Sequence, residues 1–255
     1  MANLKEIRNR IGSVSSTMQI TSAMKMVSAA KLKKAQDAIT AMRPYSNKLT
    51  QMLVNLSSSI DFENIYLKPR KAENLLVVCI TSNRGLCGAF NSNIIKKCFD
   101  LADNHEGNTS FFCIGKKGAD ILSKNHNVID SNNEIFDELS FEKVSLIAEV
   151  LMKKYTEKEV DSIQIVYNKF KNAATQIVML EQYLPIENTV TENNQKESAD
   201  YIFEPSKIEI ISELIPKSLR TQLFKSIRDS YASEHGARMT AMHKATDNAT
   251  ELRDC

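Results

Sequence analysis

Residues 4–32 read LKEIRNRIGSVSSTMQITSAMKMVSAAKL, and this stretch indicates the fold class. Its apolar side chains recur in steps of three and four residues, beginning with Leu4, Ile7, Ile11, Val14 and Met18. The same register continues to Leu53 and Leu56, and 12 of the 16 positions in its two rows are apolar. A 3.5-residue repeat sustained this long predicts one coiled-coil helix over residues 1–57. A helix of roughly 80 Å is too long to be buried on all sides, so we expect it to protrude.

Of the four polar residues in the two rows, three lie close together: Thr21, Lys25 and Ser28. Either they form a polar layer that sets the register of the coiled coil, or the seam there leaves its partner helix and faces something else. Pro44 also lies inside the predicted helix, and proline usually kinks or ends a helix. Because the heptad phase carries on beyond it to Leu53, we expect a kink and not an end.

The C-terminal part of the chain returns as a second long helix. From Ser206 onward there is one proline, Pro216, and one glycine, Gly236. Small residues then follow at every fourth position: Ala237, Ala241, Ala245 and Ala249. Such a stripe permits close approach of two helices, so we expect residues 206–255 to form an antiparallel coiled coil with residues 1–57.

The middle of the chain, residues 74–205, is predicted to be an inserted α/β body. Apolar runs predict strands at 75–81, 111–115, 162–170, 175–184 and 201–205. Helices are expected after residue 88, at 118–124 and at 140–157, and a loop at 188–200. The fold class is therefore α/β: a long antiparallel coiled coil of the terminal helices with an inserted Rossmann-like body, whose sheet is mainly parallel with one antiparallel edge.

Charge is unevenly distributed along the chain. Residues 1–56 hold nine Lys or Arg and two acids, a net charge of +7, which leaves −5 on the rest because the total is +2. A basic arm of this kind favours an acidic partner: a nucleic acid, a membrane surface or an acidic protein. No apolar run is long enough for a membrane helix, and the N-terminus lacks the features of a secretory signal. Five cysteines without a C-x-x-C pair indicate a reducing compartment.

No catalytic or metal-binding constellation emerges from the sequence. His235 and His243 are expected to be solvated helix residues, and no metal and no cofactor is predicted. The strand and glycine loop that end at Gly88 lack a phosphate-binding fingerprint, so a tight turn is the simpler explanation. Cys87, near Arg84 and a helix start, is a candidate for a lowered thiol pKa.

Three segments resemble the gamma subunit of the rotary F-type ATP synthase. They are KEIRNRIGSV at 5–14 with QITSAMKMVSAAK at 19–31, SNRGLCG at 82–88, and SEHGARMTAMHKATDNA at 233–249. The resemblance implies a central rotor stalk, one copy per complex, that couples proton flow through the c-subunit ring to conformational cycling of the catalytic beta subunits. It implies no catalytic residues and, as partners, the alpha and beta subunits, the epsilon subunit and the c ring, with no nucleic acid. It also implies a bacterial inner-membrane location, peripheral and on the cytoplasmic side.

The resemblance further implies which residues contact the alpha–beta hexamer. Met24, Lys25, Lys31 and Lys33 match the family at the place where an acidic loop of the beta subunits is met. Arg238 and Met242 match on the return helix, and either a hexamer contact or intramolecular pairing remains open for them.

One departure from the family pattern and two alternative functions remain. Family members continue beyond the segment that ends at Ala249, so we expect the C-terminus to be short relative to the family; the N-terminal agreement suggests a bacterial protein without a transit peptide. A basic coiled-coil scaffold for nucleic acid or an anionic membrane, and an α/β nucleotide enzyme, are the alternative functions.

Overall fold

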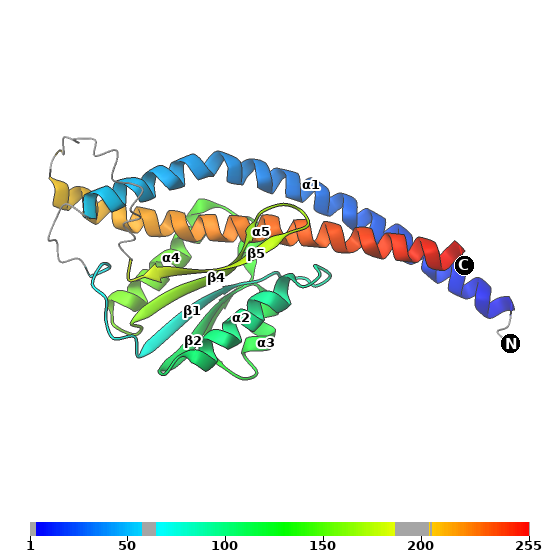
Figure 1. Cartoon of the computed structure of the whole chain (residues 1–255), viewed down its shortest axis with the longest axis horizontal. Helices are drawn as coiled ribbons and strands as arrows, with labels where there is room; N and C mark the ends of the chain where they lie inside the picture. The colour runs from blue at the N-terminus through cyan, green and yellow to red at the C-terminus, as the bar shows by residue number, and fades with distance from the viewer. Residues whose placement is uncertain (1–3, 58–64, 187–203, 205, 255) are drawn as a thin grey trace.

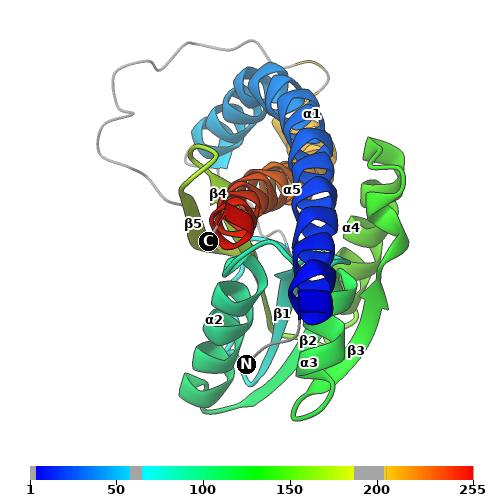
Figure 2. The ribbon, with the colours of Figure 1, turned by 90° about the vertical axis from the view of Figure 1, so that its right-hand side faces the viewer.

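The computed structural model describes residues 4–57, 65–186, 204 and 206–254. Two long helices, α1 (Leu4–Ser57) and α5 (Lys207–Asp254), lie side by side and run in opposite directions (Figure 1). Both ends of the chain lie at the same tip of this pair, and α5 lies between α1 and the sheet (Figures 1 and 2). The predicted antiparallel pair of terminal helices is confirmed.

The heptad rows are the buried side of α1. Every fully buried side chain among residues 4–53 falls on them, as the following set shows: Thr21, Ser28, Leu32, Ala35, Ile39, Ser46, Leu49 and Leu53. The helix continues through Pro44, so the expectation that proline does not end it is confirmed. Nearer the N-terminus the same rows are exposed, with Leu4 at 74%.

The body is a five-stranded sheet of order β3-β2-β1-β4-β5. The strands are β1 (Asn74–Ile80), β2 (Asn108–Ile114), β3 (Asn127–Asn132), β4 (Ser162–Phe170) and β5 (Gln176–Leu184). All neighbours pair in parallel except β4 and β5, which form an antiparallel edge as predicted. The strand predicted at 201–205 and the loop predicted at 188–200 lie outside the described residues, apart from Glu204, which is a bend.

Helices cover both faces of the sheet. On one face, α2 (Phe90–Asn104) and α3 (Lys116–Leu122) bury Phe90, Ile94 and Leu122 against alternate residues of β1 and β2. On the other face, α4 (Phe141–Thr156) and α5 pack against the intervening residues. A short 3₁₀ helix, η1 (Glu134–Phe136), precedes α4. This two-sided covering explains why β1 is a continuous apolar run and not an alternating one.

The edge strand β3 was not predicted from the sequence. Its residues, NVIDSN, are mostly polar, and none of them is fully buried. A register irregularity opposite Phe111 and Phe112 places one extra residue, Ile129, in the strand. A short, polar and bulged strand gives neither the apolar run nor the alternation on which the prediction depends.

The backbone of α5 comes close to the turn between β4 and β5. A Cβ at Gly236 would lie 3.2 Å from the Cα of Ala173, so the absence of a side chain there permits the close approach. Ser233 Oγ donates to the carbonyl of Asn168 at 2.9 Å, and Thr240 Oγ1 to that of Ala173 at 3.1 Å. The coiled coil is thereby fixed to the body.

Helices in the described part of the chain are too polar or too short to cross a membrane.

Candidate partner-binding site

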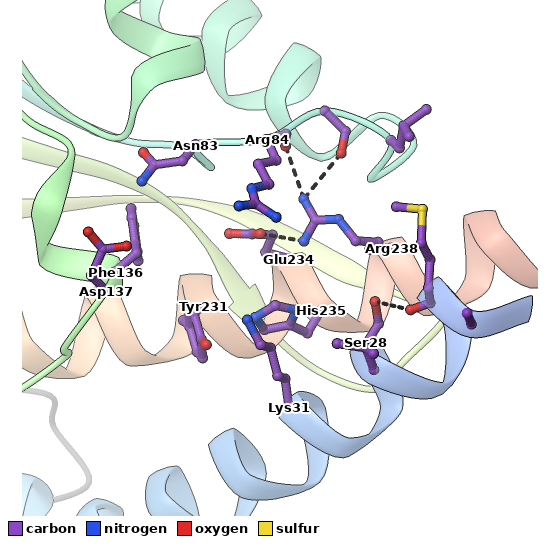
Figure 3. A pocket seen from close by; sticks show the side chains of 15 residues that line it. Ser28, Lys31, Asn83, Arg84, Phe136, Asp137, Tyr231, Glu234, His235 and Arg238 are labelled. Atoms are coloured by element: carbon purple, nitrogen blue, oxygen red, sulfur yellow. Dashed lines mark hydrogen bonds and ion pairs between the residues drawn. The ribbon is translucent and has the colours of Figure 1, made fainter. Parts of the chain in front are cut away.

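A cavity of about 480 Å³ opens where α1, the 82–88 loop, η1 and α5 meet. We call it the loop–helix cavity; the residues that matter here are Met24, Val27, Lys31, Arg84, Leu86, Glu234, His235 and Arg238. Lys31 from α1 and Arg84 from the loop approach Glu234 and His235 from opposite sides (Figure 3). Of the contact residues implied on α1, the structure brings Met24 and Lys31 to this cavity. Lys25 and Lys33 do not line it.

Hydrogen bonds hold the 82–88 loop in a defined conformation. Ser82 Oγ donates to the carbonyl of Arg84 at 2.6 Å, and its backbone N–H donates to Asn91 Oδ1 at 3.0 Å. Leu86 has a φ of 62° and Gly88 a φ of 59°, both in the left-handed region. A leucine in that region costs roughly 1–2 kcal/mol, yet its side chain is 65% exposed. The loop therefore presents an apolar side chain to solvent on a strained backbone.

Arg238 lies inside the molecule. It is 7% exposed, and its guanidinium pairs with Glu234 one turn earlier on α5. Its Nη2 donates to the carbonyls of Arg84 at 3.0 Å and Gly85 at 3.2 Å (Figure 3). These contacts are the intramolecular pairing that the sequence left open for Arg238 beside a hexamer contact. Met242, at 4% exposure, is likewise buried.

The polar residues in the heptad rows face α5. Thr21 Oγ1 lies 2.8 Å from Thr246 Oγ1, and Ser28 Oγ donates to the carbonyl of its own helix at Met24. Lys25 Nζ lies 3.4 Å from His243 Nδ1. The contacts of Thr21 and Lys25 favour a polar layer within the coiled coil, whereas Ser28 lines the loop–helix cavity.

His235 corrects another expectation from the sequence. It is only 5% exposed, and both ring nitrogens are buried without a hydrogen-bond partner among the described residues. Burial, reinforced by the positive charges of Arg238 and Lys31, lowers the pKa of His235 from 6.5 to about 3. The ring is therefore neutral at physiological pH. His243, by contrast, is exposed as predicted.

Charge in the cavity is positive and partly uncompensated. Burial raises the pKa of Glu234, while Arg238, Lys31 and Arg84 act in the opposite direction. Within the part of the chain that the structure describes, Glu234 pairs with Arg238, and no ion pair reaches Lys31 or Arg84. With the exposed apolar side chains of Val27 and Leu86 beside these two cations, the cavity suits an acidic, amphipathic protein segment.

The four cysteines that lie within the described residues are buried. Cys87 is 1% exposed, and burial raises the pKa of its thiol, so the lowered pKa considered from the sequence is wrong. Cys79, Cys98 and Cys113 are also free and buried. Over residues 4–57, 65–186, 204 and 206–254, no group of three or more His, Cys, Asp or Glu side chains is placed to hold a metal ion.

Comparisons with known proteins agree on one family. A family model described as ATP synthase matches residues 3–254. The ATP synthase gamma chain of Flavobacterium psychrophilum is 63% identical over 257 residues, which cover 100% of this chain and 90% of that protein. The gamma chain of Cytophaga hutchinsonii is 47% identical, over 99% of this chain and 89% of that one.

Solved structures resemble the fold as well. The central stalk and c-ring structure of the Tetrahymena thermophila mitochondrial ATP synthase contains a chain that is 26% identical. That match has a TM-score of 0.68 and covers 89% of this chain and 99% of the other. A chain of the Euglena gracilis mitochondrial ATP synthase rotor, 22% identical with a TM-score of 0.70 over 98% of this chain and 93% of the other, shares the fold. With the family model and the relatives in agreement along its whole length, the chain belongs to the ATP synthase gamma chain family.

Proposed function

We propose that this chain is the non-catalytic shaft of an ATP synthase, in which the paired helices α1 and α5 transmit rotation to the catalytic beta subunits. The gamma chain is a rotor subunit of the complex, and the long helix pair is suited to that role. Family membership favours this function over a nucleic-acid or membrane-surface scaffold, which the basic arm alone left open.

The partners at the helix pair are the alpha and beta subunits, and an acidic loop of the beta subunits binds at the loop–helix cavity. The observation that carries this proposal is the unpaired state of Lys31 and Arg84 beside exposed Val27 and Leu86. Opposite charge at such a rim steers association and orients the partner, more than it adds affinity. Met24 supplies an adaptable apolar contact at the same place.

Lys25 and Lys33 extend the same contact surface along α1. Lys33 is exposed and Lys25 is half-buried beside His243. The body binds the epsilon subunit and rests on the c ring, with one copy of this chain per complex. The complex is membrane-associated, and the absence of a membrane-crossing helix in the described residues fits a peripheral subunit. We place it on the cytoplasmic side of a bacterial inner membrane.

Coexpression with the alpha and beta subunits tests the function. The complex is purified through a tag on beta and weighed by native mass spectrometry. We expect one copy of this chain with three alpha and three beta subunits. A beta-tagged hexamer that never retains this chain would contradict the shaft function.

Charge reversal tests the contact surface. Lys31→Glu removes an unpaired cation from the cavity, and Lys48→Glu is the matched control, because Lys48 is exposed on the same helix and donates to Gln51. The first substitution should weaken retention of the chain and uncouple hydrolysis from rotation, and the loss should grow at low salt. Equal behaviour of the two variants would remove Lys31 from the interface.

A further inference from the structure

The 82–88 loop combines an exposed tip with a buried root. Leu86 at the tip is 65% exposed, whereas Cys87, the next residue, is 1% exposed. The φ of 62° at Leu86 is one that bulky residues rarely adopt. Such a backbone conformation persists only where surrounding contacts hold it in place. Something in the structure must therefore fix the loop close to its tip.

Besides the bond from Ser82 Oγ to the carbonyl of Arg84 within the loop, the contacts close to the tip come from one side chain of α5. Arg238 donates to two successive carbonyls, those of Arg84 and Gly85, and its other terminal nitrogen pairs with Glu234. A planar guanidinium can bond to all three acceptors at once, and an ammonium group cannot reproduce that fork. Glu234, itself 8% exposed, fixes the direction of the guanidinium. The arginine thus joins the loop to α5 across more than 150 residues of sequence.

We infer that Arg238 is a positioning residue that clamps residues 84–86 to α5 and so holds Leu86 and Arg84 in register with the outer face of α1. The clamp joins two separate elements, the loop tip and α1, into one rigid partner-binding surface. The identity of the partner rests on the proposed function, but the clamp does not. Arg238 itself is 7% exposed and acts through the loop that it holds.

The first experiment measures the clamp in the full chain alone. Arg238→Lys keeps the positive charge, and therefore its effect on the Cys87 thiol, but loses the fork. We expect alkylation of Cys87 by N-ethylmaleimide, followed by peptide mass mapping, to be at least about tenfold faster, because local opening exposes the thiol. Arg228→Lys is the matched control: Arg228 also lies on α5 and donates to a loop carbonyl, that of Leu139 at 3.3 Å.

A thermal melt by circular dichroism accompanies both variants. Faster alkylation of Cys87 in Arg238→Lys alone, with both melts near that of the parent chain, supports the clamp. An alkylation rate within about twofold of the parent would overturn it. So would an equal acceleration in Arg228→Lys, because a general loosening of α5 would then explain both.

The second experiment asks whether Arg238 acts through the loop. Leu86→Ala removes the exposed side chain, and we expect about tenfold weaker binding to the alpha–beta hexamer, as burial of a leucine predicts. Arg238→Lys should weaken binding to a similar extent. The double variant should be no weaker than either single one, because a tip that is already mispositioned has no contact left to lose.

The outcomes of this cycle are separable from those of the first experiment. Losses that multiply in the double variant would show that Arg238 does not act through Leu86, and would overturn the positioning role. Unchanged binding in Leu86→Ala would remove the loop tip from the interface. In that case faster alkylation of Cys87 would still establish the clamp, and the proposed partner surface alone would fail.

Discussion

The two long helices are similar in length but differ in how much of their surface is buried. α1 buries only its heptad rows against α5, and its other faces remain exposed, with Ile20, Met26 and Val27 at 57–65%. α5 is enclosed by α1 on one side and by the sheet and α4 on the other. Between residues 226 and 238 only Arg228 and Tyr231 are not fully buried.

This difference separates structural residues from contact residues. On α5, polar groups such as Asp229, Ser233 and Glu234 are buried and must find partners inside the molecule. On α1, exposed apolar and basic side chains are available to another subunit. Truncations of buried apolar side chains in α5 should therefore act first on folding, and changes on the outer face of α1 should act first on assembly.

The largest contrast is expected from equivalent truncations in the two helices. Leu223→Ala in α5 removes a side chain that is 0% exposed, and Leu32→Ala in α1 removes one that is 7% exposed. We expect losses in the free energy of unfolding of about 4 and about 2 kcal/mol, respectively, measured by urea denaturation. Equal losses would show that α5, which is enclosed on two sides, is packed no more tightly than α1, which is buried on one side.

The next largest effect should appear in the pH dependence of stability, which tests the burial of His235 on α5. The pKa of His235 is about 3 in the folded chain and 6.5 as its ordinary value, so the unfolded chain binds more protons between these two values. Stability from this group is complete above pH 6.5 and is lost as the pH falls. From pH 7 to pH 5 we expect the parent to lose about 2 kcal/mol more than His235→Gln does. Parallel pH profiles of the two proteins would mean that the ring is not held neutral.

A smaller effect is expected from the ion pair that joins the helices. Asp229 on α5 is 1% exposed and lies 3.6 Å from Arg43 Nη2 on α1, which is 46% exposed. Arg43→Met keeps the apolar stem but leaves the buried carboxylate without its cation, at a cost of about 1–2 kcal/mol. In an Asp229→Asn background the same substitution should cost less than about 0.5 kcal/mol. An unchanged cost there would show that the pair contributes nothing.

The smallest effect should come from the outer face of α1. Met26→Gln exchanges a 65% exposed side chain for one of similar helix propensity, so the free energy of unfolding should change by less than about 0.5 kcal/mol. Urea denaturation measures it alongside Leu32→Ala. A loss comparable with that of Leu32→Ala would mean that this face is packed and not free.

The sequence predicted the features that depend on residues near one another in the chain, and it missed those that depend on distant segments coming together. The buried side of α1 from Thr21 to Leu53 was predicted, because a heptad pattern is local and α5 is the main neighbour of α1. His235 was misplaced, because its burial depends on the loop, the sheet and α1 meeting around α5, and for the same reason the sequence could not choose between the two alternatives for Arg238 and Met242. Nothing in the sequence near His235 distinguishes a solvated helix position from an enclosed one. Leu86 was not identified, although a bulky residue between two glycines of a loop is a signal that could have been used.

The bulged edge strand β3 has a consequence for the chain before it joins a complex. An unpaired strand edge is a template for pairing with another molecule, and long, flat, apolar edges lead to aggregation. β3 is short, carries Asp130, and is bent by the extra residue at Ile129. A newly made subunit that waits for its partners with this edge exposed is thus protected against pairing with a second copy of itself.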